Sequence, residues 1–321
     1  MTVVKFMWRG VRSSRVSGAI MVASLCVDLL SGCSAVEWIG IHFLYEKVEF
    51  PESQVLRDQP YREGSSPEHR LDLFFPEGAG WPVLIFVHGG GWNTGDKDLI
   101  IGGADVYGNI GRFFASHGVG VAIVNYRLLP QVSWREQIED VADATAWVNS
   151  HVADYGGSPN RLFLFGHSAG AQIASRVALD SNPLKKLGLS PRILCGVVAV
   201  SGAGLDLQDA KTYALGEDIR YYEKRFRDGD ADEAWKKAAS PIPFVSASAP
   251  PFLIVYAEGE SKGLQRQSKL LHEALMSAGT HSRIVIVPGE SHQRILLALS
   301  HPDKVAGAAI LEFLQNIPCD R

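Results

Sequence analysis

The sequence predicts a doubly wound α/β domain with a mostly parallel central sheet, and three observations support this prediction. Unbroken runs of Val, Ile and Leu recur along the chain, which is typical of strands buried on both faces. Segments of helical length separate these runs. No linker-like stretch or repeat divides the chain after residue 60, so its 321 residues, 46% of them hydrophobic, are expected to share one core.

The expected elements follow one another in regular alternation. An apolar-aromatic stretch at 38–45 is expected to form a helix that packs on the body or lies at a membrane surface. The strands are predicted at 72–75, 83–87, 119–124, 162–165, 193–200, 252–256 and 284–287. The helices between and after them are predicted at 107–117, 134–151, 169–179, 264–278 and 303–315.

The segment 204–249 interrupts this alternation, because it separates two predicted strands by far more than one helix needs. A connection of this length is usually functional. We expect it to form a small helical cap over the reactive site; the alternative is a helical excursion away from that site. Five aromatic residues lie within it: Tyr213, Tyr221, Tyr222, Phe226 and Trp235.

The N-terminus has the composition of an export signal. Four basic residues precede an apolar stretch at 16–30, which is the order of a signal peptide: Lys5, Arg9, Arg12 and Arg15. Leu30-Ser-Gly-Cys33 then resembles the bacterial lipobox, in which the cysteine is lipidated. An ordinary signal or a single membrane anchor is the alternative, because Asp28 lies within the apolar stretch.

These features predict three regions. Residues 1–32 are expected to be a lipoprotein-type signal peptide, residues 33–60 a tether or helix, and residues 61–321 the catalytic domain. The mature protein is then expected to be exported and anchored to a bacterial membrane through a lipid on Cys33.

Charge and cysteine content narrow the class further. The net charge is −4 and no basic stripe appears, which argues against a nucleic-acid partner. Cys195 lies in an apolar run and Cys319 near the C-terminus. A disulfide between them would suit an oxidising compartment, but a buried free thiol at Cys195 is the favoured expectation. The cysteines form no metal-binding pattern.

The motif Gly166-His-Ser168-Ala-Gly170 lies between a predicted strand and a predicted helix. A Gly-x-Ser-x-Gly sequence in that context is typical of a nucleophile elbow, a sharp turn that raises the serine hydroxyl above the sheet. Glycine two residues to either side relieves the crowding at such a turn. Ser168 is therefore the predicted nucleophile.

A second motif, His88-Gly-Gly-Gly-Trp92, follows another apolar run. The backbone N–H groups of Gly90, Gly91 and Ala169 are the predicted donors of an oxyanion hole. A nucleophile together with an oxyanion hole supplies the two parts that acyl transfer most needs.

The substrate pocket has three candidate residues, namely His88, Trp92 and His167. We expect His88 to brace the glycine loop by hydrogen bonding, while Trp92 either lines the acyl pocket or packs beneath it. 

A serine nucleophile needs a base, which comes last in the chain order serine, acid, histidine. His292 follows the last buried strand after a short turn, a position that brings the imidazole back over the strand ends. The alternative is His301, which precedes a proline and is better explained as a cap of the final helix. His292 is the predicted base.

The acid that orients the base is one of two carboxylates after the strand at 252–256. The third residue of such a loop commonly projects back over the sheet end, which favours Glu260 over Glu258. The acid must hold the imidazole tautomer without taking its proton. The remaining glutamate is expected to cap the helix that follows.

Taken together, these motifs resemble the α/β-hydrolase superfamily, within its triple-glycine esterase and lipase branch. The resemblance runs from about residue 71 to 314. Tyr155-Gly-Gly-Ser-Pro-Asn-Arg161 and the elbow through Gln172 are similar to isoprenylcysteine methylesterases and related bacterial carboxylesterases. Glu260-Ser261 followed by Arg266-Gln-Ser268 resembles kynurenine formamidases, which also supports Glu260 as the acid.

The resemblance implies a serine–histidine–acid mechanism without metal or cofactor, acting on a small-molecule ester. A short- to medium-chain carboxylesterase is the expected function. The alternatives are an exported polysaccharide acetyl or feruloyl esterase, an arylformamidase, and a catalytically silent α/β-hydrolase fold used for binding. An export signal fits poorly with a formamidase of cytosolic tryptophan catabolism.

Overall fold

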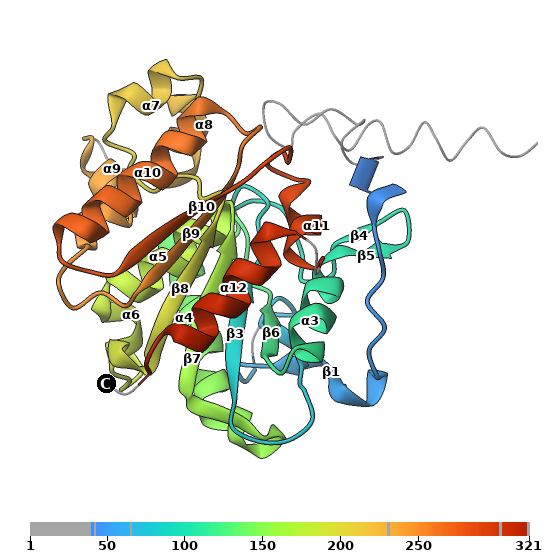
Figure 1. The fold of residues 1–321 in the computed structure, drawn as a ribbon. Coiled ribbons are helices and arrows are strands. Elements are labelled where there is room, and N and C mark those ends of the chain that lie inside the picture. Colours follow the sequence, from blue (N-terminus) through green and yellow to red (C-terminus); the bar gives the residue numbers. More distant parts are fainter. Residues whose placement is uncertain (1–39, 42, 65, 230–231, 302–303, 320–321) are drawn as a thin grey trace, which may run out of the picture.

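The computed structural model describes residues 40–41, 43–64, 66–229, 232–301 and 304–319 (Figure 1). The predicted signal peptide at 1–32 and the predicted lipidation site Cys33 lie outside these residues. Residues 40, 41, 43 and 44 are helical, inside the helix predicted at 38–45. None of the described helices is long and apolar enough to span a membrane.

An eight-stranded sheet forms the centre of the fold, in the order β1-β2-β6-β3-β7-β8-β9-β10. β2 pairs antiparallel with both of its neighbours, and the other pairs are parallel. The mostly parallel sheet predicted from the apolar runs is thus confirmed. Its strands are β1 (Val55–Pro60), β2 (Arg70–Phe74), β3 (Trp81–Val87), β6 (Gly120–Val124), β7 (Gly157–His167), β8 (Leu194–Val200), β9 (Phe252–Ala257) and β10 (Ser282–Val287).

The boundary expected at residue 60, between a tether and the catalytic domain, does not match the central sheet, because β1 is one of the strands of that sheet. This strand lies within the segment predicted to be a tether, and it pairs with β2 at the edge. Its residues are only partly buried or exposed, and it ends at Pro60. An edge strand buried on one side needs no continuous apolar run, so the pattern that revealed the central strands is absent here.

Helices cover both faces of the sheet (Figure 1). Alternate residues of β3 divide between two cores, with Leu84 and Phe86 on one face and Val83, Ile85 and Val87 on the other. The first core includes residues of α3 (Val106–Ser116), α11 (Ile295–Leu299) and α12 (Val305–Asn316). The second includes residues of α4 (Trp134–His151), α5 (Ala169–Leu179), α6 (Ser181–Lys186) and α10 (Lys262–Ser277).

The described part of the segment between β8 and β9 contains three short α-helices, α7 (Ala210–Ala214), α8 (Ile219–Phe226) and α9 (Ala234–Ala239), and a 3₁₀ helix, η4 (Ile242–Phe244). The three α-helices lie beyond the end of β8 in Figure 1, and we call the segment 204–249 the cap. Phe226 and Tyr222 meet the indole of Trp92 edge to face, at ring centroid distances of 4.8 and 6.0 Å. The cap therefore packs on the loop that contains the triple glycine, and does not point away from it.

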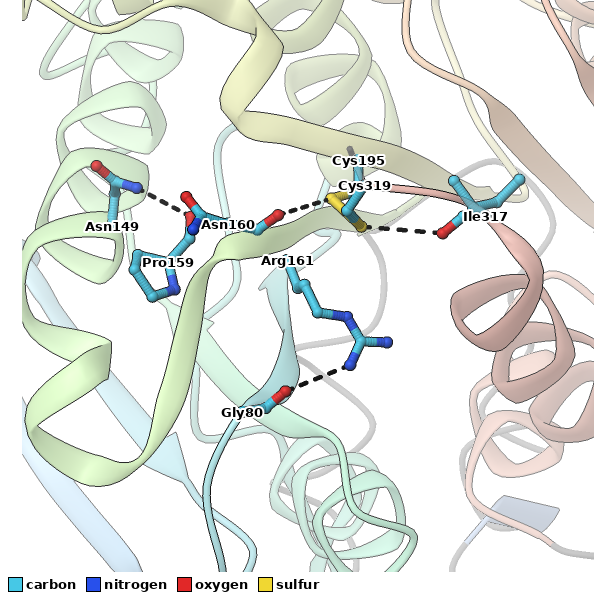
Figure 2. Close-up of a disulfide and its surroundings, with 8 residues drawn as sticks. All are labelled: Gly80, Asn149, Pro159, Asn160, Arg161, Cys195, Ile317 and Cys319. Atoms are coloured by element: carbon cyan, nitrogen blue, oxygen red, sulfur yellow. Dashed lines mark hydrogen bonds between the residues drawn. A yellow bond between two sulfur atoms is a disulfide. The ribbon is translucent and has the colours of Figure 1, made fainter. Parts of the chain in front are cut away.

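Cys195 and Cys319 form a disulfide, with their Cα atoms 5.0 Å apart (Figure 2). The favoured expectation of a free thiol at Cys195 is therefore wrong. Cys195 lies at the start of β8, and the chain after α12 returns beside it. The bond ties the C-terminal segment to the amino end of the sheet.

Candidate active site

Ser168 lies in a strained turn between β7 and α5. Its backbone adopts φ 55° and ψ −118°, a conformation that a residue with a side chain rarely takes. A side chain at Gly166 would collide with the carbonyl of Gly170, and one at Gly170 with the carbonyl of Val87. Both glycines of the motif are thus needed for this close approach of β3, β7 and α5. The turn leaves the Ser168 hydroxyl beside the first turn of a helix.

His292 is within hydrogen-bonding distance of this hydroxyl. Its Nε2 lies 2.9 Å from Ser168 Oγ, and its Nδ1 lies 3.1 Å from Glu260 Oε2. Because the carboxylate accepts the proton on Nδ1, Nε2 is left as the acceptor of the serine proton, which is the tautomer that a general base needs. His301, the alternative base, lies 3.2 Å from Glu46 instead.

The two candidate acids occupy different environments. Glu260 is buried, and its loop is held by Gln265, whose side-chain amide donates to the carbonyls of Glu258 and Glu260. Glu258 is exposed and its carboxylate accepts from the Gly289 amide at 3.2 Å. The expectation that Glu258 caps the next helix is wrong, because the Ser261 hydroxyl accepts from the Leu264 amide there.

The triple glycine forms a loop whose carbonyl groups are held by hydrogen bonds. His88 Nδ1 donates to the Gly89 carbonyl at 2.7 Å, and Thr94 donates to the Gly90 carbonyl from both its amide (3.0 Å) and its hydroxyl (2.7 Å). Because a peptide unit is planar, fixing these two carbonyls also fixes the N–H groups of Gly90 and Gly91.

The predicted oxyanion donors lie free for a ligand. Within the described part of the chain, the amides of Gly90, Gly91 and Ala169 donate no hydrogen bond. Ala169 is the first residue of α5, so its N–H belongs to a helix N-terminus, where partial positive charge favours an anion. Gly90 and Gly91 have φ angles of 123° and 59°, which other residues rarely adopt.

His88 and Trp92 are buried beneath the loop. The His88 ring stacks on Tyr126 at 4.4 Å between centroids, and burial lowers the pKa of His88. It braces the loop, as expected, but it is fully enclosed and lines no open pocket, so that part of the expectation is corrected. Trp92 is 1% exposed and packs under the cap. Of its two expected positions, lining the acyl pocket or packing beneath it, the structure shows the buried one.

His167, the residue before the nucleophile, contacts the base. Its Nε2 donates to the backbone carbonyl of His292 at 2.9 Å. Burial and the neighbouring His292 lower the pKa of His167 to about 3. The ring is therefore neutral at physiological pH, and it serves as a brace for the loop of the base instead of lining an exposed pocket.

Three residues that hold this geometry were not singled out from the sequence. Thr94 and Gln265 hold the loops described above. Gln172 accepts from the Trp92 indole at 3.0 Å and donates to the Ala239 carbonyl at 2.7 Å, so it links the glycine loop to the cap. Gln172 follows Ser168 by four residues, one helical turn, and that spacing was the available signal.

Comparison with known proteins gives the family. The BD-FAE family model matches residues 71–275. The chain is 31% identical over 268 residues to the esterase LipQ of Mycobacterium tuberculosis (strain ATCC 25618 / H37Rv), covering 80% of this chain and 61% of LipQ. It is 27% identical over 265 residues to the isoprenylcysteine alpha-carbonyl methylesterase ICME of Arabidopsis thaliana, covering 77% and 58%. The chain thus spans less than two thirds of these relatives.

Solved structures share the fold at lower identity. Esterase B from Lactobacillus Rhamnosis (HN001) superposes with a TM-score of 0.69 at 23% identity, over 88% of this chain and 89% of that one. A truncated carbohydrate esterase from gut microbiota superposes with a TM-score of 0.64 at 20% identity, over 84% and 97%. These likenesses identify the architecture as the α/β-hydrolase fold.

Proposed function

The chain belongs to the BD-FAE family of α/β-hydrolase esterases, and from this membership and the geometry at Ser168 we propose that it is a carboxylic ester hydrolase acting on short- to medium-chain esters. The observation that carries the proposal is the continuous path from Ser168 Oγ to His292 Nε2 (2.9 Å) and from His292 Nδ1 to Glu260 Oε2 (3.1 Å). Named esterases among the relatives support the same class.

In the proposed mechanism Ser168 Oγ attacks the ester carbonyl carbon while His292 Nε2 takes the hydroxyl proton. The carbonyl oxygen becomes an oxyanion, which the amides of Gly90, Gly91 and Ala169 stabilise. Loss of one such donor typically costs about 3–4 kcal/mol of transition-state stabilisation.

Collapse of the tetrahedral intermediate breaks the bond to the leaving alcohol, which receives the proton from His292. Water then attacks the acyl-enzyme, with His292 as base again, and releases the acid and free Ser168. Throughout both steps Glu260 stabilises the imidazolium. The proton taken in each attack is returned in each collapse, so the enzyme ends unchanged.

The position of the cap favours a small ester over a polymer as the proposed substrate. Tyr222 and Phe226 pack on Trp92 directly beside the glycine loop, and burial raises the pKa of Tyr221 and Tyr222, so these phenols stay neutral. A well-packed aromatic cap beside the glycine loop restricts the approach to Ser168, which suits a small ester. An open cleft would instead suit an acetylated or feruloylated polysaccharide.

A chain-length series tests the proposal. Hydrolysis of p-nitrophenyl acetate through palmitate is measured beside N-formylkynurenine and an acetylated xylan, with wild type and Ser168→Ala. The expected result is an optimum at short chains that Ser168→Ala abolishes. Preference for the formamide or the polysaccharide would favour those alternatives, and ester turnover that survives Ser168→Ala would reject the mechanism.

We also propose that the protein is anchored to a membrane through Cys33. The proposal is supported by the lipobox-like sequence ending at Cys33 and by two exposed apolar side chains near the start of the described chain, Phe43 (79%) and Leu44 (56%). Metabolic labelling with a fatty-acid analogue tests it. Label on the wild type and none on Cys33→Ser is expected, and an unlabelled wild type would contradict it.

A further inference from the structure

The three carbonyl groups of the triple-glycine loop are held from different places. Those of Gly89 and Gly90 bond to His88 and Thr94, which belong to the same turn of chain. The carbonyl of Gly91 accepts from Arg225 Nε at 2.7 Å, and Arg225 comes from helix α8 of the cap, 134 residues away in sequence. The last peptide of the loop therefore depends on the cap for its partner.

Arg225 is itself fixed by a full set of contacts. Its Nη1 donates to the Tyr221 carbonyl at 2.9 Å and its Nη2 to Asn93 Oδ1 at 3.2 Å. The guanidinium also lies over the Tyr221 ring, 3.5 Å from the centroid. Each of its three nitrogen atoms is thus engaged, and the planar fork has one orientation available.

The same helix contacts the loop at a second point. A side chain at Gly91 would collide with the Tyr221 hydroxyl, so that oxygen lies against the Gly91 Cα. Tyr221 and Arg225 are four residues apart and share one face of α8. One turn of α8 therefore contacts Gly91 at two atoms, with Tyr221 against the Cα and Arg225 bonded to the carbonyl oxygen.

The glycine loop needs such restraint because its backbone conformation is unfavourable. Trp92, which follows Gly91, has φ 67°, in the left-handed region that a bulky residue rarely occupies. A strained conformation of this kind persists only where its surroundings impose it. The Trp92 carbonyl accepts from the Leu129 amide at 3.0 Å and from Gln137 Nε2 at 2.7 Å, and the Trp92 indole donates to Gln172. Arg225 holds the peptide just before it.

We propose that Arg225 is a positioning residue of the oxyanion hole. It holds the Gly91–Trp92 peptide through the Gly91 carbonyl, and so fixes the backbone of Gly91, whose own amide is a predicted donor toward Ser168. This inference rests on the proposed esterase function and adds a role for the cap, which then organises the catalytic loop. Arg225 touches no reacting atom.

The consequence is confined to the transition state. The negative charge on the ester oxygen develops only as Ser168 attacks, so the loop amides stabilise the tetrahedral state far more than the bound ester. A displacement of the order of 1 Å in such a group can cost roughly 100-fold in rate. Loss of Arg225 should therefore lower kcat and leave KM for a small ester nearly unchanged.

The test compares Arg225→Met, Arg225→Lys and the control Arg220→Ala on p-nitrophenyl acetate. Methionine keeps an unbranched side chain over Tyr221 and removes every donor, while lysine keeps one charge without the fork. Arg220 lies on the same helix, is 84% exposed and pairs only with Asp218 among the described residues. Affinity for a boronic acid that forms a tetrahedral adduct with Ser168 is measured alongside.

Arg225→Met is expected to lower kcat roughly 10- to 100-fold, with KM within about threefold of the wild-type value. Its affinity for the boronic acid should fall by a factor similar to that of kcat. Arg225→Lys should recover part of the loss, and Arg220→Ala should match the wild type. If Arg225→Met does not fold, Arg225→Lys decides by the same split between kcat and KM.

The inference would be overturned if Arg225→Met, or Arg225→Lys where Arg225→Met does not fold, kept the wild-type kcat. A raised KM together with an unchanged affinity for the boronic acid would also overturn it. These results leave the proposed function standing, because the wild type and Arg220→Ala still turn over the ester. A wild type without ester turnover would instead reject the proposed function itself.

Discussion

The His167 imidazole donates from Nε2 to the backbone carbonyl of His292 at 2.9 Å, so the residue before the nucleophile holds the chain that carries the base. The two rings lie 5.0 Å apart between centroids. This bond joins the end of β7 to the loop after β10 without using either side chain of the serine–histidine pair. The position of His292 is therefore set by the backbone as well as by Glu260.

Neutral, buried His167 should make folding stability depend on pH. Burial lowers its pKa to about 3 in the folded protein, whereas the unfolded chain has the ordinary value near 6.5. The unfolded state then binds more protons below about pH 6.5, so the stabilising contribution is complete above that pH and is lost as the pH falls toward 3.

His167→Asn removes this titration. Urea unfolding at pH 7.5 and 5.5 is expected to show a smaller pH dependence in the variant, by about 1 kcal/mol, than in the wild type. His117→Asn, at an exposed helix end, serves as the control. An equal pH dependence in His167→Asn and wild type would mean that His167 already titrates normally.

The two glutamates after β9 should differ sharply in their effect on activity. Glu260→Gln removes the carboxylate that fixes the tautomer of His292, and kcat should fall roughly 100- to 10,000-fold. Glu258→Gln changes an exposed side chain on the same loop and should leave kcat within about threefold. Steady-state rates with p-nitrophenyl butyrate measure both, and the reverse order would identify Glu258 as the acid.

Gln172 should matter for stability because two buried groups depend on it. In Gln172→Leu, the Trp92 indole N–H and the Ala239 carbonyl lose their partners. An unsatisfied buried polar group costs about 1–3 kcal/mol, so the free energy of unfolding should fall by roughly 2–4 kcal/mol. Gln208→Leu, at an exposed cap position, is the control in urea titrations. Equal stability of the two variants would contradict the bridging role.

The disulfide should stabilise the fold without affecting the reaction. Cys195 lies near the start of β8 and Ser168 contacts its end, where the Ser168 amide donates to Val200. The closed loop has a sequence separation of 124 residues, for which the chain-entropy model gives about 4–5 kcal/mol.

Cys319→Ser is expected to lose about 2–4 kcal/mol of unfolding free energy in non-reducing urea titrations, with kcat unchanged. A reducing agent should destabilise the wild type and leave the variant as it is. A wild type that is indifferent to the reductant would argue that the two thiols are unpaired.

The sequence predicted the central strands and most helices because each carries a strong pattern. The run at 83–87 lies within β3, and the helix expected at 134–151 matches α4. Strand β1 was missed since an edge strand alternates and carries no run. The pairing of Cys195 with Cys319 depends on where α12 returns across the sheet, which is a tertiary relationship that neither cysteine reveals locally.

At the site, the motifs predicted which residues meet but not what holds them. Ser168 and His292 lie in recognisable contexts after apolar strands, and the structure brings them together with Glu260. Arg225 lies in a cap of irregular pattern, and its bond to Gly91 spans 134 residues. No local periodicity encodes such a contact, so the restraints on the glycine loop became apparent only from the fold.

Covalent trapping of the nucleophile tests the central claim most directly. A p-nitrophenyl alkylphosphonate reacts with an activated serine, releases one p-nitrophenol and leaves a stable tetrahedral adduct. We predict one equivalent released per chain, with the added mass on the peptide that contains Ser168, and no release from Ser168→Ala. An adduct on another residue, or a burst that persists in Ser168→Ala, would contradict the account.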